Sequence, residues 1–229
     1  MSEKTKVDTK LYANLMGEVK HRLNALNTAL GGYLPVAGPF VQDFCYLQLR
    51  LLCELIALAC LTAHGDIQET NSKKLRKEYS ADKIITALGQ LHEDFYPRPF
   101  QQTMKSPHFF DAVVVENDHL TKEDLIALYG TCGDKLHRGN LKRILSENLP
   151  KQVNFPDIQK WGQKISNLLA AHLITLKGQE NIMLCFLGTK EKPHKVQVAM
   201  SEFVEPTGPR DEHGVPLSLK GRSSGPAGA

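Results

Sequence analysis

The sequence predicts a mainly α-helical fold: a helical bundle of about five main helices with a small C-terminal β-hairpin. Two observations predict it. Apolar residues recur at spacings of three and four over long stretches of the first 178 residues, which is the period of a helix with one buried face. Beyond them, two short apolar runs flank a turn-rich segment, as in a hairpin. We therefore divide the chain into a helical bundle domain (1–178), a β-hairpin appendage (179–206) and a disordered tail (207–229).

The first two helices are expected to form an antiparallel pair. The first covers Asp8–Leu30, where leucine and valine side chains form one stripe. The Gly31-Gly32 pair would end it, because glycine readily adopts the backbone conformation that follows a helix C-terminus. The second covers Pro39–Ala63, since proline suits the first turn of a helix. Helices joined by so short a loop pack antiparallel.

The second helix is apolar on nearly all sides, yet it contains Asp43, Arg50 and Glu54. A helix that is apolar all round is typically buried. A charge inside it must be paired, because an isolated buried ion costs several kcal/mol. The longest uncharged stretch, Leu55–Ala63, is much shorter than the about 20 apolar residues that a membrane-spanning helix needs. The pattern therefore predicts a core helix and no membrane contact.

The middle of the chain is expected to alternate short helices with loops. Ser72–Tyr79 is charged and predicts a short exposed helix, and Ala81–His92 predicts a helix with Ser80 as its N-cap. The Phe95–Phe110 segment contains three prolines, which interrupt a helix, so we expect an ordered loop there. A short strand over Asp111–Glu116 would follow.

The last part of the bundle comprises two further helices. One covers Thr121–Arg138 and starts with acidic residues that favour the helix dipole. The other covers Asp157–Leu176 and carries one apolar face. Strand-like runs over Ile182–Leu187 and Val196–Met200 form the predicted hairpin. The segment Thr207–Ala229 is rich in Gly, Pro and Ser and is expected to be disordered.

Composition places limits on the function. A net charge of +3 is too small to indicate a nucleic-acid surface by itself. The five cysteines include no CxxC pair and no cluster with zinc-ligand spacing, so we expect neither a metal site nor a cofactor. An odd number of cysteines, three of them in one apolar helix, favours a reducing compartment. The polar N-terminus predicts no signal peptide, and together these features predict a cytoplasmic protein.

Two constellations are candidates for chemistry. Arg50 and Glu54 are four residues apart on the second helix, so they form either an ion pair that fixes the bundle register or part of an interhelical cleft. Near the end of the fourth predicted long helix, Asp134 lies three residues before His137, and Tyr129 lies about two turns before it. Such a histidine can carry a proton, or it can simply cap the helix end.

These two segments, LRLLCELIALACLTAHGD (Leu49–Asp66) and YGTCGDKLHRGN (Tyr129–Asn140), resemble HEPN-like bacterial helical proteins. The shared features are a long helix with an internal Arg and acid, followed by Tyr-x7-His near a helix end. HEPN domains are helical bundles that often dimerise. Many are metal-independent ribonucleases, and others are RNA-binding or antitoxin-contacting modules. The resemblance therefore implies a homodimer with a role in RNA metabolism or bacterial defence.

In active HEPN domains, an Arg and a His on one helix line a cleft at the dimer interface. The corresponding Arg is absent here, because the matching positions are Gly130, Thr131 and Cys132. Arg50 or Arg138 would then stabilise phosphate charge while His137 moves a proton. The candidate catalytic residues are His137, Arg50, Glu54, Tyr129 and Asp134. The candidate RNA-binding residues are Lys135, Arg138, Lys142 and Arg143.

Two other classes of function stay open. In the first, the chain is a non-catalytic protein-interaction module, and its C-terminal hairpin pairs with a strand of a protein partner. In the second, it is a regulator that binds a small molecule in the bundle cavity. Within either class the Phe95–Phe110 aromatics can cover the core, whereas in an RNA-binding protein they can stack on bases.

Overall fold

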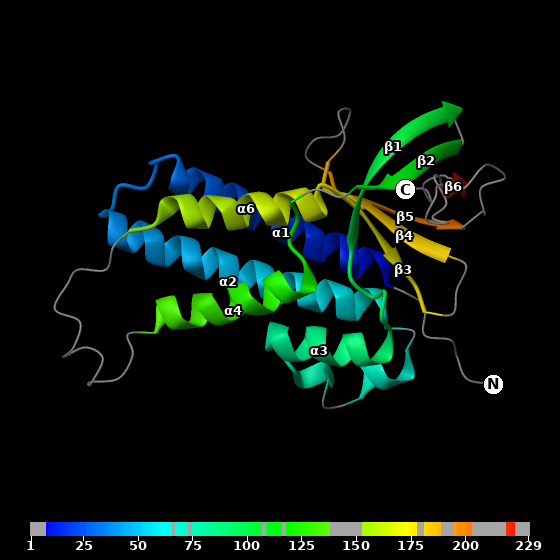
Figure 1. The fold of residues 1–229 in the computed structure, drawn as a ribbon, viewed down its shortest axis with the longest axis horizontal. Helices are drawn as coiled ribbons and strands as arrows, with labels where there is room; N and C mark the ends of the chain where they lie inside the picture. Colours follow the sequence, from blue (N-terminus) through cyan, green and yellow to red (C-terminus); the bar gives the residue numbers. More distant parts are fainter. Residues whose placement is uncertain are drawn as a thin grey trace.

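Helices α1 (Thr9–Leu30) and α2 (Gly38–Ala63) lie side by side at the centre of a helical bundle, and a sheet lies at one end of that bundle (Figure 1). The computed structural model describes residues 8–65, 67–72, 75–106, 109–115, 118–137, 153–177, 181–188, 195–202 and 219–222. Within these residues there are five α-helices, so the prediction of a mainly helical fold is confirmed.

Local signals set the ends of the first two helices close to the predicted positions. The side chain of Asp8 caps α1 by accepting a hydrogen bond from the Leu11 backbone N–H at 2.8 Å. Gly32, in the turn after α1, has a φ of 80°, a left-handed conformation that glycine adopts without strain. The two helices therefore reverse direction within a short connection.

Helix α2 is the core helix that the sequence predicted. Its length and composition would allow it to cross a membrane, but 61% of its most apolar window is buried inside the protein. Most of its apolar residues contact α1, α3 and α4, as the main hydrophobic core shows. Burial of this kind is typical of the central helix of a globular bundle.

Three further helices surround this pair: α3 (Ala81–Leu91), α4 (Lys122–Leu136) and α6 (Phe155–Leu169). A capping box between Thr121 and Asp124 starts α4. Lys164 of α6 bonds the Asp124 carboxylate at 2.7 Å and so ties α6 to the start of α4. Within the span predicted as a helix, Ser72–Tyr79, the described residues form one short 3-10 turn, η2 (Leu75–Lys77), and a second turn, η1 (Gln68–Asn71), precedes it.

The prediction of a simple hairpin is wrong, because the strands form one six-stranded antiparallel sheet with the order β5-β4-β3-β1-β2-β6. The last predicted helix ends at Leu169, and the chain continues directly as a strand. Residues within the predicted disordered tail form the strand that pairs with β2. The strands are β1 (Arg98–Ser106), β2 (Phe109–Val114), β3 (Ala171–Thr175), β4 (Asn181–Phe186), β5 (Gln197–Glu202) and β6 (Leu219–Arg222).

The Phe95–Phe110 segment, predicted as a loop, supplies β1 and the start of β2. Its prolines do not prevent pairing, because Pro99 lies near the start of β1, where a missing N–H is tolerated. Phe100 packs edge to face on Phe186 at 5.4 Å between ring centroids, in a small second core. Phe95 itself is fully buried in the main core. Phe95 and Phe100 are therefore part of the two cores, which agrees with the prediction that the aromatic residues of this segment cover the core and do not stack on bases.

Candidate functional site

Arg50, Glu54 and Tyr129 form a closed polar cluster between α2 and α4. Arg50 Nη2 donates to the Tyr129 hydroxyl at 2.8 Å, and Arg50 Nε lies 3.3 Å from Glu54 Oε1. The Tyr129 hydroxyl in turn donates to Glu54 Oε1 at 3.3 Å. Each group thus contacts the other two, and the structure brings together three of the predicted site residues.

Stacking and partial burial stabilise this arrangement. The Arg50 guanidinium carbon lies 4.4 Å from the centroid of the Tyr129 ring, within the range of a cation–π contact. The side chains of Arg50 and Glu54 are 27% and 23% exposed, whereas Tyr129 is buried. Burial raises the pKa of Tyr129, and Glu54 raises it further, while Arg50 opposes the shift. The phenol therefore stays protonated and acts as a donor.

The other described residues of the predicted site lie at the C-terminal end of α4. His137 is the C-cap residue, and its backbone N–H donates to the Gly133 carbonyl at 3.0 Å. Asp134, Lys135 and His137 are all exposed. In the part of the chain that the structure describes, no hydrogen bond or ion pair joins His137 to Asp134 or to the Arg50–Glu54–Tyr129 cluster. Arg138, Lys142 and Arg143 lie outside the described residues.

Helix geometry quantifies the separation. Tyr129 lies eight residues before His137, about 12 Å along the helix axis, whereas the Arg50 guanidinium lies beside Gly133, four residues or about 6 Å before His137. A proton carrier and a cation that act on one phosphate must both reach it by direct hydrogen bonds. The cluster therefore has the geometry of an ion pair that holds α2 against α4, and its guanidinium charge is balanced by Glu54.

Two glycines of α4 differ in their surroundings. A Cβ at Gly133 would lie 3.4 Å from Arg50 Nη1, so α4 approaches the cluster closely there. A Cβ at Gly130 would meet nothing within 4 Å. Close packing inside the monomer therefore accounts for the first glycine and not for the second.

A second polar site, which sequence reasoning missed, joins α1 to the sheet. His172 of β3 is fully buried, and its Nε2 lies 2.6 Å from the Tyr12 hydroxyl. Its Nδ1 lies 3.0 Å from the Leu169 carbonyl oxygen, which can only accept. Nδ1 must therefore carry the proton, and Nε2 accepts the hydrogen bond from Tyr12. Burial lowers the pKa of His172 to about 4 and raises that of Tyr12, so both groups are neutral.

Two more histidines connect the ends of α2 and α3 to the sheet region. His64 Nε2 lies 3.0 Å from the Phe95 carbonyl oxygen, and His92 Nε2 lies 3.0 Å from that of Thr175. The two imidazole rings meet edge to face at 5.2 Å. Both histidines thus bond backbone carbonyls where helices adjoin the sheet, which is a structural role.

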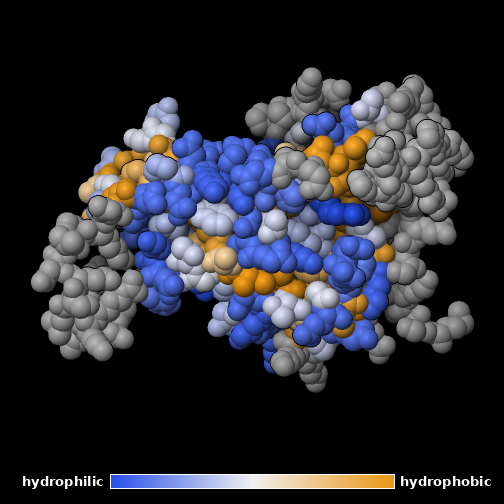
Figure 2. All heavy atoms as spheres, in the orientation of Figure 1, coloured by the Kyte–Doolittle hydropathy of each residue, from blue (hydrophilic) through white to orange (hydrophobic). Residues whose placement is uncertain are grey.

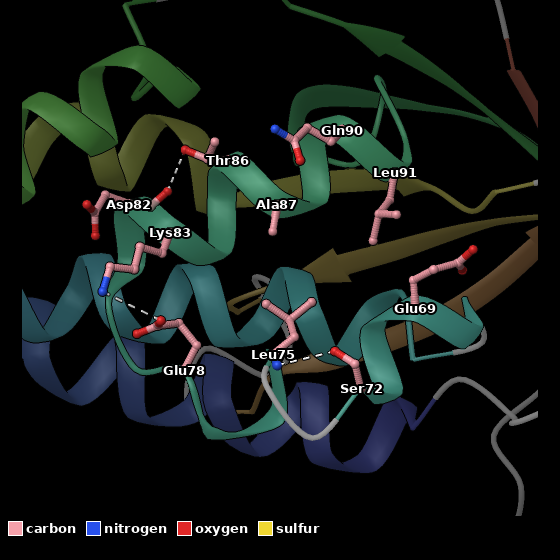
Figure 3. A pocket seen from close by; sticks show the side chains of 10 residues that line it. All are labelled: Glu69, Ser72, Leu75, Glu78, Asp82, Lys83, Thr86, Ala87, Gln90 and Leu91. Carbon is pink, nitrogen blue, oxygen red and sulfur yellow. Dashed lines mark hydrogen bonds and ion pairs between the residues drawn. The ribbon is translucent and has the colours of Figure 1, made fainter.

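A cavity of about 450 Å³ lies between the η1–η2 segment and α3 (Figure 3). Leu75 from one wall and Ala87 and Leu91 from the other point into the same space, and the Lys83–Glu78 ion pair closes one end at 3.7 Å. This cavity lies beside α3, and its described lining includes no residue of the Arg50–Glu54–Tyr129 cluster. Its volume is within the range of small-molecule sites, but its lining combines both signs of charge and selects no ligand class.

The thiols are placed as core residues. All five cysteines are free and buried. Burial raises the pKa of Cys45 to about 11 and that of Cys132 to about 12, so these thiols stay protonated and are poor nucleophiles. Among the described residues, no three His, Cys, Asp or Glu side chains gather in a way that could hold a metal ion.

Comparisons with protein-family models, curated proteins and solved structures find no match to this chain. The resemblance to HEPN-like proteins therefore rests on the Leu49–Asp66 and Tyr129–Asn140 segments alone.

Proposed function

We propose that the protein is a HEPN-like RNA-binding protein that contacts RNA through the C-terminal end of α4. The observation that carries the proposal is the exposure of Lys135 and His137 at this end, directly before Arg138 in the sequence. Lysine and arginine side chains that neutralise phosphates supply most of the affinity for nucleic acid. Lys142 and Arg143 follow within a few residues and extend the same basic segment.

The geometry favours binding over cleavage. Metal-independent cleavage of RNA needs a proton carrier and a cation at the same phosphate. Arg50 is bonded to Glu54 and Tyr129, which balance its charge and occupy its donors, and the raised pKa of Tyr129 keeps the phenol proton in place. We therefore expect RNA to stay intact when the protein binds it.

A salt-dependent binding measurement tests the proposal. Fluorescence anisotropy with single-stranded RNA, at about 50 and 200 mM salt, would compare the wild-type protein with Lys135→Glu/Arg138→Glu. We expect at least a tenfold rise in Kd for this variant and a salt slope reduced by about 1.4, because each single-strand phosphate contact contributes about 0.7. The matched control, Lys160→Glu/Lys177→Glu, makes the same charge change at two exposed lysines elsewhere in the chain. An equal loss of RNA affinity in the two variants would show that only the net charge of the protein matters, and would contradict the proposed surface.

Incubation of RNA with the protein in EDTA separates binding from catalysis. We expect no cleavage products from either the wild-type protein or His137→Ala. Cleavage by the wild-type protein that disappears in folded His137→Ala would replace this proposal with the nuclease hypothesis.

A further inference from the structure

We propose that the connection between α1 and α2 is a stacking site for unpaired bases, so that the RNA bound by this protein is single-stranded. This inference rests on the proposed RNA-binding function and names the class of RNA that the protein takes. Tyr33, Val36 and Phe40 form the site, which we call the aromatic corner. Tyr33 and Val36 precede α2, and Phe40 lies in its first turn.

The aromatic corner is open to solvent. Tyr33 is 78% exposed, Phe40 is 64% exposed and Val36 is 53% exposed. Figure 2 shows hydrophobic surface at the end of the bundle where α1 passes into α2 in Figure 1. Other exposed apolar residues, such as Leu11 and Ile126, stand on separate helices, as single surface hydrophobes normally do. Large apolar side chains gathered at one connection instead indicate a binding surface.

The glycine after α1 gives the Tyr33 ring its position. A Cβ at Gly31 would lie 2.7 Å from Tyr33 Cε2 and 3.0 Å from Tyr33 Cδ2, so the edge of the ring lies directly against the Gly31 backbone. The rest of the ring faces solvent. A ring that is already packed along one edge loses less conformational freedom when a ligand stacks on it than a freely rotating side chain would.

The aromatic corner lies at the same end of the bundle as the C-terminal end of α4. Arg50 contacts Tyr129 in the first half of α4. Lys135, near its end, has its Nζ 6.0 Å from the centroid of the Tyr46 ring, so α4 runs toward the start of α2. Six residues separate Tyr46 from Phe40, about 9 Å along the helix axis. One short single strand can reach both places, because such strands occupy about 4–16 nucleotides on a protein domain.

The basic segment that follows α4 is also anchored at this end. His137 is the C-cap residue of α4, and Val153 is the next described residue along the chain. Val153 lies beside the first turn of α2, since a Cβ at Gly38 would lie 3.8 Å from Val153 Cγ2. The residues that flank Lys142 and Arg143 in the sequence are therefore both at the end that carries the aromatic corner (Figure 1).

The chemistry of the corner suits bases better than phosphates or anionic lipids. Residues 31–42 contain no charged side chain, and the first charge after them, Asp43, is negative and exposed. A carboxylate at this position repels phosphate groups, whereas an aromatic ring can stack on the π face of any base. Base contacts therefore fall on Tyr33 and Phe40, and phosphate contacts fall on Lys135.

Binding to a strand without bases tests the stacking. Fluorescence anisotropy would compare a single-stranded RNA of about 12 nucleotides with an abasic strand of the same length and charge. The wild-type protein should bind the abasic strand at least about fivefold more weakly, because it loses the stacked bases. Tyr33→Ser/Phe40→Ser should bind both strands with this weaker Kd. Its salt slope should equal that of the wild type, since stacking neutralises no phosphate.

Two further variants and a duplex separate stacking from a structural role. Tyr33→Trp should keep the wild-type affinity, and its added indole fluorescence should be quenched by the normal strand but not by the abasic one. Tyr79→Ser is the matched control, because Tyr79 is 71% exposed on a different segment, and it should bind both strands like the wild type. A duplex RNA of the same length, whose bases are already stacked, should bind the wild type and Tyr33→Ser/Phe40→Ser equally. Circular dichroism would verify that all variants fold.

The outcomes distinguish this inference from the proposed function. Equal binding of normal and abasic strands by the wild type, with a loss in Lys135→Glu/Arg138→Glu, would overturn the stacking site alone. If the wild type binds no RNA, both proposals fail. A loss in Tyr79→Ser as large as that in the corner variant would also overturn the site. Wild-type binding to phosphatidylcholine vesicles that is lost in Tyr33→Ser/Phe40→Ser, without discrimination between the two strands, would assign the corner to a membrane instead.

Discussion

Two tyrosines hold two parts of this molecule together in opposite ways. Tyr129 joins α4 to a charged pair on α2 whose side chains are about one quarter exposed. Tyr12 joins α1 to His172 of the sheet in a site without solvent exposure. Partial exposure limits the desolvation cost of the Arg50–Glu54 ion pair, whereas burial keeps Tyr12 and His172 neutral. Solvent access therefore decides whether a tyrosine hydroxyl is bonded to an ion pair, as in Tyr129, or to a neutral group, as in Tyr12.

The largest expected difference between the two sites is in their response to acid. The unfolded chain binds a proton at a histidine with a pKa of about 6.5, but folded His172 has a pKa of about 4. Between these values the unfolded state holds more protons, so stability present above about pH 6.5 is lost as the pH falls toward 4. The loss amounts to about 3 kcal/mol.

Denaturant unfolding of the wild-type protein and His172→Leu at several pH values would measure this effect. Carboxylates contribute to both proteins, so the difference between the two curves isolates His172. The difference in the free energy of unfolding between the two proteins should narrow as the pH falls. A difference that does not change with pH would contradict a neutral His172.

The next largest effect is expected for Tyr12→Phe. The substitution leaves His172 Nε2 buried without its donor, which costs about 1–3 kcal/mol. The free energy of unfolding at neutral pH measures it. An unchanged value would mean that water or another group replaces the phenol.

Tyr129→Phe should destabilise the protein less, by about 0.5–1.5 kcal/mol, because Arg50 and Glu54 keep each other and solvent as partners.

Glu54→Gln should lower the free energy of unfolding by less than about 1 kcal/mol, as expected for partly exposed ion pairs. Its cost should also shrink in about 1 M salt, which screens exposed charges. A larger cost for Tyr129→Phe than for Tyr12→Phe would reverse the comparison between the two sites.

The smallest effect concerns the helix that carries Tyr129. Gly130→Ala should stabilise the protein by about 0.5–1 kcal/mol, because an added Cβ meets nothing and alanine favours the helix. Gly162→Ala on α6 is the informative control, since its Cβ would lie 3.0 Å from Leu26 Cδ2 and force a shift. Thermal unfolding of both variants would show opposite signs if the packing around these glycines is as described.

The helices were predictable because their signals are local. Periodic leucines and a glycine pair located α1, and the four-residue spacing predicted the Arg50–Glu54 contact. The sheet was not predictable in this way. β3 follows α6 after a single residue, Ala170, with no proline or glycine to mark the change. Tyr12, the hydrogen-bond partner of His172, lies 160 residues earlier in the chain, so no local sequence pattern connects the two.

The pairing of β1 with β3 has a consequence for biosynthesis. Arg98 pairs with Leu173, and three of the five α-helices among the described residues precede the first strand. As the chain leaves the ribosome, β1 and β2 emerge well before β3 and β6, so both edges of their ladder wait without a partner. Closing such a long-range contact is slow relative to helix formation. The interval between synthesis of β1 and β3 is therefore the time at which the nascent chain is most exposed to aggregation and has most need of a chaperone.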